Sequence, residues 1–328
     1  MIEERLFTPA RMTARPALVV ILGPTAAGKT EVAIQISERL GGEIVSADSR
    51  LFYRGMDIGT AKPTPAEQMR APHHLIDVAE PDQIWSLALF QQKAREAIAE
   101  ITARGRLPLL VGGTGQYIRA VIQGWEVPKV EPDPGLRKAL EDWAVEIGGD
   151  GLHQRLASLD QMAAATIDPR NLRRTVRALE VILSSGRRFS EQRRSQPTPY
   201  RLLLLGLTRP RPELYQSIDA RIQRMIDAGL VDEVRELLRR GYSPGLPTLS
   251  AIGYREMIAY LQGKISFEEA VRQMRRATRI FVRRQANWFK PDDPDIHWFN
   301  AGPNTRDEMI GVIREFLGVD LVQESDSG

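Results

Sequence analysis

The sequence predicts a doubly wound α/β fold, in which helices cover both faces of a parallel sheet and a helical insertion interrupts the core. Short apolar runs with the length and composition of buried strands recur along the chain. Amphipathic helical patterns, with apolar residues three and four positions apart, alternate with those runs. The strand signals stop between residues 124 and 199, where only helical stretches bounded by Pro and Gly occur.

The elements follow from this alternation in chain order. The runs expected to form strands cover residues 18–22, 43–47, 107–111, 202–207 and 296–299. The amphipathic patterns predict helices over residues 29–40, 87–103 and 217–239. A further long helix is expected over residues 266–290, opened by a possible capping box of Ser266 and Glu269.

These elements predict three parts of the chain. Residues 15–123 and 200–300 form the α/β core, and residues 124–199 form the helical insertion. Residues 301–328 hold a short helical pattern followed by a polar end that we expect to be disordered.

The composition excludes several classes of protein. The chain has 328 residues, 42% of them hydrophobic and 27% charged, as in ordinary globular proteins. It lacks an apolar stretch of roughly 18 residues, and its first 16 residues contain no apolar signal region, so we expect a cytoplasmic protein. The absence of Cys excludes disulfides and thiol catalysis, and the four His lack metal-site spacing. Nothing indicates an obligate protein partner.

The basic residues are mainly arginine. The formal net charge is only +3, but 38 of the 45 basic residues are Arg. Arg binds phosphate in a planar, bidentate manner, which favours phosphate-bearing partners. A GC-rich genome would explain the same ratio equally well.

A phosphate-binding loop follows the first predicted strand and opens the next helix. The segment Gly23-Pro24-Thr25-Ala26-Ala27-Gly28-Lys29-Thr30 fits the pattern G-x-x-x-x-G-K-T in the context that this pattern requires. Loop amides and a helix N-terminus direct partial positive charge at a phosphate, Lys29 adds a cation, and the Thr30 hydroxyl is a ligand for Mg²⁺. This motif makes the core P-loop NTPase-like, but ATP and another diphosphate suit the loop equally well.

Two more strand ends are expected at the same edge of the sheet. Asp48 follows the second strand, where it could be a catalytic base, cap the next segment, or lie behind the magnesium ion. Thr114, in Val111-Gly-Gly-Thr-Gly115, follows the third strand, where glycines permit close approach of a ligand. Arg221 lies on or beside the apolar stripe of its helix, and an inward Arg needs an anion, either a phosphate or a carboxylate such as Asp219 or Asp232. An Arg that extends along the surface to water is the other alternative.

Two Arg-rich segments favour a nucleic-acid partner. Residues 271–290 contain six Arg and Lys290 without an acidic residue, a pattern that would repel itself unless a polyanion lies nearby. The insertion contains a second run that includes Arg173, Arg174 and Arg177. A solvated cationic face is the alternative for either segment alone.

As an ordered set, the motifs resemble those of the tRNA dimethylallyltransferases, which are also called IPP transferases. Besides the P-loop, the resemblance rests on residues 46–50, Tyr53-Arg-Gly-Met-Asp-Ile-Gly-Thr-Ala-Lys-Pro63, residues 72–77 and Val111–Gly115. It continues through residues 168–171 and 177–180, Gly229-Leu-Val-Asp-Glu-Val234, residues 251–255 and 283–285, and Trp288. It covers residues 17–299.

The resemblance implies a function and a set of roles. It implies transfer of a dimethylallyl group from its diphosphate to N6 of adenosine 37, next to the anticodon, in tRNAs that read codons beginning with U. The P-loop then holds dimethylallyl diphosphate with Mg²⁺ rather than ATP, Asp48 is the general base, and Lys29, Thr114 and Arg221 lie at the leaving group.

The same resemblance implies that the insertion contacts the anticodon stem-loop of tRNA. The residues implied to bind tRNA are Asp48, Ser49, Arg50, Leu51, Arg137, Arg173, Arg174, Thr175, Val176, Arg177, Ser250, Ala251, Ile252, Gly253, Tyr254, Arg255, Arg283, Arg284, Gln285, Trp288 and Lys290.

The sequence departs from the family pattern in two places. Leu51 and Phe52 stand where Gln-Val is usual, and Gln116 replaces a commoner Leu. The first departure puts in doubt a polar contact to the target base or its neighbour.

Two alternatives stay open, one within the resemblance and one from a different enzyme class. An adenylate isopentenyltransferase acts on a free nucleotide and needs neither Arg-rich segment. A P-loop kinase or ATPase would need a Walker-B strand, and the sequence offers none that ends in Asp other than the strand before Asp48.

Overall fold

The computed structural model describes residues 15–126, 128, 130–192 and 197–318. The chain forms two compact units, one made of Met1–Ile118 with Pro199–Gly328 and the other of Arg119–Thr198. In the described part of the chain, no helix is both long enough and apolar enough to cross a membrane.

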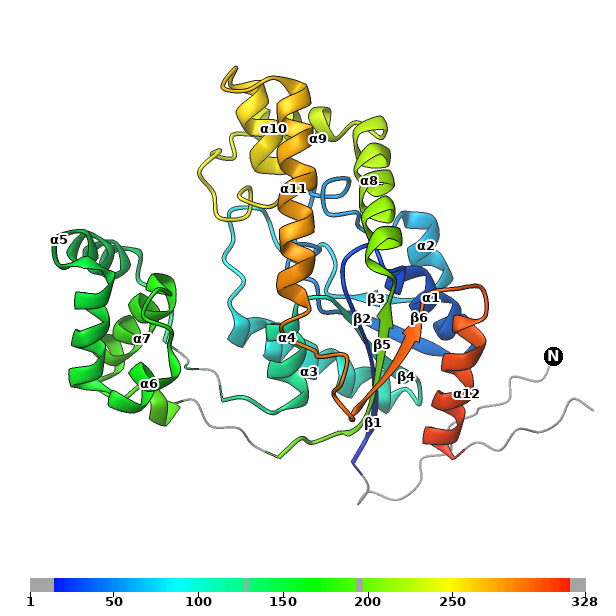
Figure 1. The fold of residues 1–328 in the computed structure, drawn as a ribbon. Coiled ribbons are helices and arrows are strands. Elements are labelled where there is room, and N and C mark those ends of the chain that lie inside the picture. The colour runs from blue at the N-terminus through cyan, green and yellow to red at the C-terminus, as the bar shows by residue number, and fades with distance from the viewer. Residues whose placement is uncertain (1–14, 127, 129, 193–196, 319–328) are drawn as a thin grey trace, which may run out of the picture. The chain divides into compact units, whose positions relative to one another are not determined.

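A sheet of six parallel strands forms the centre of the larger unit (Figure 1). The strands are β1 (Ala17–Leu22), β2 (Gly42–Ser46), β3 (His73–His74), β4 (Leu107–Gly112), β5 (Arg201–Thr208) and β6 (Ile296–Asn300). Their order is β3-β2-β4-β1-β5-β6, and Val19 of β1 lies between Leu109 of β4 and Leu203 of β5. The phosphate loop therefore leaves an inner strand of the sheet.

All five predicted strands are confirmed to within two residues at each end. Every residue of β1, β2 and β4 is buried, which explains the continuous apolar runs of β1 and β4. β2 also buries Glu43, whose carboxylate binds His74 and Arg104. β3 was not predicted, because a two-residue edge strand is too short to show a pattern.

The helices of the larger unit pack on this sheet or on one another (Figure 1). They are α1 (Lys29–Leu40), α2 (Pro65–Arg70), α3 (Leu87–Ala103), α4 (Gly115–Ile122), α8 (Arg211–Asp227), α9 (Leu230–Arg239), α10 (Tyr254–Leu261), α11 (Phe267–Gln285) and α12 (Thr305–Leu317). α4 begins in this unit and continues past its boundary. Apolar residues of α1 and α12 pack with the strands in one core cluster, among them Ile34, Ile36, Ile310 and Ile313. The predictions for α1 and α3 are confirmed residue for residue.

The single helix predicted over residues 217–239 was wrong, because the chain breaks it into α8 and α9. α8 begins earlier, at Arg211, and ends at Asp227. Gly229 then adopts a left-handed conformation, with φ of 95°, which starts α9 in a new direction. Arg221 and Glu233 consequently lie on different helices.

The Arg-rich helix α11 begins as predicted and ends earlier. The Ser266 hydroxyl accepts the N–H of Glu269 (3.2 Å), but the Glu269 carboxylate binds Arg272 and Gln273 rather than closing a capping box. The helix ends at Gln285 instead of Lys290. The predicted polar end falls on residues 319–328, which lie outside the described residues.

In the described part of the smaller unit, the named elements are all helices, joined by irregular segments. It contains the second half of α4, then α5 (Pro134–Leu159), α6 (Gln161–Thr166), α7 (Leu172–Ser185) and a short 3₁₀ helix (Ser190–Gln192). α5 is kinked at Gly148. The hydrophobic core of the smaller unit includes Leu140, Leu152, Leu156, Val176 and Leu179. The unit starts five residues before the predicted insertion of residues 124–199.

Candidate active site

The phosphate loop joins β1 to the first turn of α1. Gly28 has a left-handed conformation, and α1 begins at Lys29, so the helix N-terminus faces the loop. The Lys29 ammonium donates to the Pro24 carbonyl (2.8 Å). Burial lowers the pKa of Lys29 to about 8, with the Asp48 carboxylate opposing and the Arg221 cation adding to the shift. Lys29, Asp48 and Arg221 therefore share one electrostatic environment.

A cavity in the larger unit brings together segments that are far apart in the sequence. It is bounded by the phosphate loop, the ends of β2 and β4, the loop between β2 and β3, and α8. The lining residues that carry chemistry are Thr25, Lys29, Thr30, Ser46, Asp48, Thr60, His73 and Arg221. The carboxyl ends of parallel strands meet at one edge of a sheet, which is where this cavity lies.

Asp48 is positioned by the turn that follows β2. Its Oδ1 accepts the Arg50 N–H (3.0 Å), and the Leu51 N–H donates to its carbonyl (3.3 Å). Oδ1 therefore caps the segment that follows β2, which was one of the roles considered for Asp48 from the sequence. The side chain still lines the cavity beside Lys29, so this turn fixes its direction toward the site.

Arg221 reaches the cavity from α8 and is not held by a carboxylate of its own helix. Its guanidinium donates to the Thr60 carbonyl (2.9 Å). The salt bridge considered from the sequence was wrong, because Asp219 binds Arg279 and Asp232 binds Arg235. Burial lowers the pKa of Arg221, and Asp48 opposes that shift. Among the described residues, the Thr60 carbonyl is the one hydrogen-bond partner of this guanidinium, which retains N–H groups for an anion.

The turn after β4 is tied to the phosphate loop by Gln285. The Gln285 amide accepts the Thr25 N–H (2.9 Å) and donates to the Gly113 carbonyl (3.0 Å). The Thr114 carbonyl accepts the N–H of Tyr117 (2.9 Å) at the start of α4. Among the described residues that line the cavity, Gly112 and Gly113 occur but Thr114 does not. The role of Thr114 at the leaving group stays a prediction.

The oxygen atoms available for a metal are few. Thr30 and Asp48 line the cavity, and within the described ranges no group of three or more acidic, His or Cys side chains could hold an ion by itself. Mg²⁺ commonly takes one or two protein oxygens and completes its shell with phosphate and water. The residues fit a magnesium ion that is bound together with a diphosphate.

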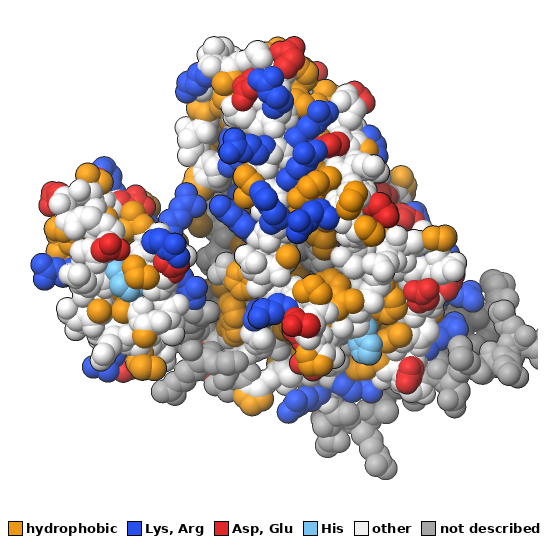
Figure 2. Space-filling view, in the orientation of Figure 1, with side chains coloured by type: hydrophobic (Ala, Val, Ile, Leu, Met, Phe, Trp, Pro, Cys, Tyr) orange, Lys and Arg blue, Asp and Glu red, His pale blue; other side chains and the backbone are white. Residues whose placement is uncertain are grey.

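A basic surface lies along α11, and Figure 2 shows Lys and Arg side chains gathered over this part of the larger unit. Arg272 binds Glu269, and Arg279 binds Asp219 of α8 (2.6 Å). Arg276, Arg283 and Arg284 are exposed. The helix thus reduces its self-repulsion with two carboxylates and still presents a cationic face.

Several residues implied to bind tRNA have protein partners in the structure. Arg50 donates to the carbonyls of Pro247 and Thr248, Arg255 binds Glu256, and both Arg137 and Arg177 bind the fully buried Glu180. The side chains that are buried in their own unit belong to Thr175, Val176, Ala251, Tyr254 and Gln285. Arg173, Ser250 and Lys290 are exposed, and Ser49, Leu51, Arg174, Ile252 and Trp288 are partly exposed. Their contacts with RNA stay predictions.

The departures from the family pattern have separate surroundings. Phe52 is fully buried against the rings of Trp85, Phe90 and Tyr117, so it belongs to an aromatic core. Leu51 lines the cavity, and Gln116 is exposed in the first turn of α4. Only Leu51 stands where it could alter the site.

The sequence did not single out the chemistry of the loop between β2 and β3. Thr60, Ala61 and Pro63 line the cavity, together with His73 and Ile76. The only signal was their membership of the motifs at residues 53–63 and 72–77. Backbone carbonyls and buried polar networks leave no periodic pattern in a sequence.

Comparisons with known proteins agree with this arrangement. A family model described as IPP transferase matches residues 51–292, and a model described as isopentenyl transferase matches residues 16–77. The tRNA dimethylallyltransferase of Roseiflexus sp. (strain RS-1) is 55% identical over 273 residues, which cover 83% of this chain and 90% of the relative. The tRNA dimethylallyltransferase of Thermomicrobium roseum is 45% identical over 317 residues, which cover 97% and 95%.

Solved structures extend the likeness to the fold. The full-length tRNA isopentenylpyrophosphate transferase of Bacillus halodurans has a TM-score of 0.69 and 40% identity, covering 92% of this chain and 97% of its own. A eukaryotic dimethylallyltransferase acting on tRNA has a TM-score of 0.79 at 24% identity, covering 94% of this chain and 81% of its own, and supports the fold alone. From the family model, the identities over most of the chain and the P-loop core, it follows that this protein belongs to the IPP transferase family.

Proposed function

We propose that this protein is a tRNA dimethylallyltransferase that alkylates N6 of adenosine 37 in tRNAs reading codons that begin with U. The observation that carries the proposal is the cavity that joins the phosphate loop to Asp48 and Arg221 in a member of this family. An anion site, a carboxylate and a second cation at one place suit the departure of a diphosphate next to a weak nucleophile.

Asp48 acts on the nucleophile. The lone pair of the adenine N6 amine is delocalised into the ring, so the amine gains nucleophilicity only as it loses a proton. The bond from N6 to C1 of the dimethylallyl group forms, the bond from C1 to the diphosphate oxygen breaks, and the N6 proton passes to the Asp48 carboxylate. The Arg50 N–H holds that carboxylate in place.

The phosphate loop and Arg221 act on the leaving group. Negative charge grows on the diphosphate oxygens as the allylic carbon becomes cation-like. Lys29, Arg221 and the N-terminus of α1 lie where they can stabilise that charge. A magnesium ion held by Thr30 would neutralise part of the same charge.

The basic surface supports tRNA as the acceptor. Arg276, Arg283 and Arg284 of α11 are exposed in the unit that contains the cavity. A target adenine must leave its stack to be alkylated, as in other enzymes that modify bases, and phosphate contacts by arginine would hold the anticodon loop while it does so. We propose that the insertion contributes further tRNA contacts through Arg173 and Arg174.

A label-transfer experiment tests the proposal. Purified protein is incubated with Mg²⁺ and radiolabelled dimethylallyl diphosphate, and with either unmodified tRNA or AMP. ATP hydrolysis is followed in parallel. We expect label in tRNA alone, and digestion of that tRNA should place the label on adenosine 37.

Two other outcomes would replace this function. Label in AMP would make the protein a nucleotide-prenylating enzyme. ATP turnover without label transfer would assign a nucleoside triphosphate to the phosphate loop.

A further inference from the structure

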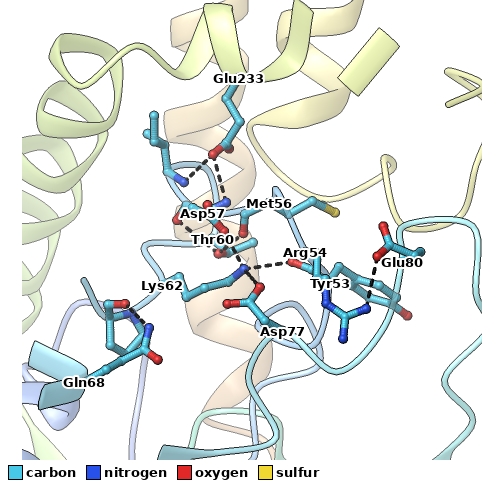
Figure 3. Close-up of polar contacts among 12 residues, drawn as sticks. Tyr53, Arg54, Met56, Asp57, Thr60, Lys62, Gln68, Asp77, Glu80 and Glu233 are labelled. Atoms are coloured by element: carbon cyan, nitrogen blue, oxygen red, sulfur yellow. Dashed lines mark hydrogen bonds and ion pairs between the residues drawn. The ribbon is translucent and has the colours of Figure 1, made fainter. Parts of the chain in front are cut away.

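Two sequence motifs without an assigned role meet in the structure. One is the segment from Tyr53 to Pro63, which follows β2, and the other is the segment from Gly229 to Val234, which starts α9. They are about 170 residues apart in the chain, and Glu233 joins them (Figure 3). Neither segment contributes a side chain to the transfer chemistry described above.

Glu233 binds the backbone of a tight turn. Its Oε2 accepts the N–H groups of Asp57 (2.9 Å) and Ile58 (2.7 Å), and its Oε1 accepts the N–H of Gly59 (3.0 Å). Consecutive backbone N–H groups that converge in this way form a site for an anion. The protein fills the site with its own carboxylate, which fixes the turn to α9.

Tyr254 of α10 completes the arrangement. Its hydroxyl donates to Glu233 Oε1 (2.6 Å), so the carboxylate accepts four hydrogen bonds. Burial and the carboxylate together raise the pKa of Tyr254 well above its ordinary value, which keeps the hydroxyl protonated. Gly59 packs against the Tyr254 ring so closely that a Cβ at this position would lie 2.4 Å from a ring atom.

Lys62 fixes the far end of the same turn (Figure 3). Its ammonium is buried and binds the Tyr53 carbonyl (2.8 Å), Asp57 Oδ1 (2.5 Å) and Asp77 Oδ1 (2.5 Å). Between these two anchors, Ala61 adopts a left-handed conformation with φ of 48°. A residue other than Gly keeps such a conformation only where its surroundings enforce it, and strain of this kind clusters at functional sites.

The turn is connected to the reaction through one carbonyl. Thr60 follows the three residues that Glu233 binds, its hydroxyl donates to the Met56 carbonyl (2.7 Å), and its own carbonyl accepts Arg221 Nη2 (2.9 Å). Arg221 lines the cavity beside Lys29 and Asp48. We propose that Glu233 is a positioning residue which, through the Asp57–Thr60 turn, holds the Arg221 guanidinium toward the diphosphate; this inference rests on the proposed function.

The charge of Glu233 is required for this role. A glutamine of the same shape would keep one carbonyl oxygen but would turn an NH₂ group toward backbone N–H donors, so part of the turn would lose its acceptor. The turn would then shift, and the Thr60 carbonyl would move with it. Diphosphate binding and turnover would fall, whereas the basic surface of α11 would be unchanged.

The test compares Glu233→Gln with Glu236→Gln. Glu236 lies three residues later on α9, is exposed, and binds only Arg239 of the same helix among the described residues. The measurements are the Kd of inorganic diphosphate with Mg²⁺, kcat and KM for dimethylallyl diphosphate, the Kd of tRNA, and Tm. For Glu233→Gln we expect diphosphate affinity and kcat to fall by about tenfold or more, as for the loss of hydrogen bonds to a charged group, with an unchanged tRNA Kd. Glu236→Gln should match the unmodified protein in all of them.

A double-mutant cycle with Arg221→Ala identifies the route of the effect. If Glu233 acts through Arg221, then Glu233→Gln should cause no further loss of diphosphate affinity in an Arg221→Ala background. An equal loss in both backgrounds would overturn the inference and leave Glu233 a purely structural residue. Tyr254→Phe removes one of the four hydrogen bonds and should shift diphosphate affinity in the same direction by a smaller factor, even if Glu233→Gln folds poorly.

The proposed function and the positioning role of Glu233 are tested separately by these measurements. If the unmodified protein neither binds diphosphate nor alkylates tRNA, the proposed function is wrong. If the unmodified protein does both and Glu233→Gln retains full diphosphate affinity and turnover, the function stands and the positioning role of Glu233 is wrong.

Discussion

The phosphate loop and the segment Asp57–Lys62, which contains the Asp57–Thr60 turn, line the same cavity. Their polar groups find different partners. In the phosphate loop, the Lys29 ammonium donates to a carbonyl of its own loop, and Gln285 accepts the Thr25 N–H. In the turn, Glu233 accepts four hydrogen bonds and the Lys62 ammonium makes three. The first arrangement leaves positive charge for a ligand, and the second uses its charges within the protein.

This difference separates residues that are available to bind a ligand from residues that stabilise the protein around the site. An ammonium that donates to a neutral carbonyl can form a stronger hydrogen bond to an anionic ligand, because a charged acceptor binds it more strongly. A carboxylate that already accepts four hydrogen bonds gains nothing from a ligand. Changes in the phosphate-loop region should therefore alter activity with little loss of stability, and changes in the turn should alter stability as well.

The largest effect is expected at Asp48. Asp48→Ala removes the proton acceptor but no phosphate contact, so turnover should fall by about 10²- to 10⁴-fold while the affinities for tRNA and inorganic diphosphate persist. Single-turnover label transfer and equilibrium binding measure the two quantities. An equal loss of tRNA affinity would contradict the role of Asp48 as a base.

A change at Lys62 tests the segment Asp57–Lys62, whose charges are used within the protein. Lys62→Met keeps the apolar stem and removes a buried cation, so the free energy of unfolding should fall by about 2 kcal/mol. The value is modest because the side chains of Asp57 and Asp77 are 58% and 41% exposed, so water can replace the lost partner. Urea denaturation measures the change.

Lys93→Met is the matched control for Lys62. Lys93 pairs with Glu96 on α3, and both side chains are nearly half exposed, so this change should cost less than about 1 kcal/mol. Equal losses for the two variants would remove the distinction between the turn and an ordinary surface pair.

The pH dependence of diphosphate binding tests the phosphate loop. The pKa of Lys29 is about 8 in the free protein, and a bound anion must raise it. Diphosphate affinity should therefore fall as pH rises above 8, by up to about tenfold per unit, because the free protein loses a proton that the complex keeps. The Kd of inorganic diphosphate with Mg²⁺ between pH 7 and 9.5 measures this.

Lys29→Arg is the control, because its guanidinium stays charged over that range and leaves only the titration of the ligand itself. The difference between the two profiles belongs to Lys29. If the profiles coincide, the ammonium does not contact the diphosphate.

The sequence predicted the sheet and the phosphate loop well because both depend on local patterns. Continuous apolar runs marked β1 and β4, and the glycine spacing marked the loop between Gly23 and Gly28. The break between α8 and α9 was missed because Val231, Val234 and Leu237 continue the apolar spacing past Gly229. The backbone conformation of one glycine overrode a periodic pattern.

The candidate site was predictable where its chemistry belongs to side chains with a local sequence signal. Asp48 follows a strand, Lys29 belongs to the phosphate-loop pattern and Arg221 lies beside an apolar stripe, and all three line the cavity. The partner of Arg221 was not found, because it is the carbonyl of Thr60, which every residue type would supply equally. The tie from Gln285 to Thr25 spans 260 residues and has no local signature.

The smallest effect is expected on the basic surface, where two arginines of α11 offer a contrast. Arg276 is exposed, whereas Arg279 binds Asp219 and lies over the Tyr215 ring. If tRNA phosphates lie along this helix, Arg276→Gln should lower the steepness of the log–log salt dependence of tRNA binding by about one unit. Arg279→Gln should change that slope less, because its charge already has a partner, and should instead lower Tm through the contact between α8 and α11.

Binding titrations between 50 and 200 mM salt, a range of about fourfold over which such slopes are measurable, distinguish the two variants. Equal slopes for both variants and the unmodified protein would mean that the tRNA backbone lies elsewhere, and the exposed Arg173 of the insertion would then be the next arginine to replace.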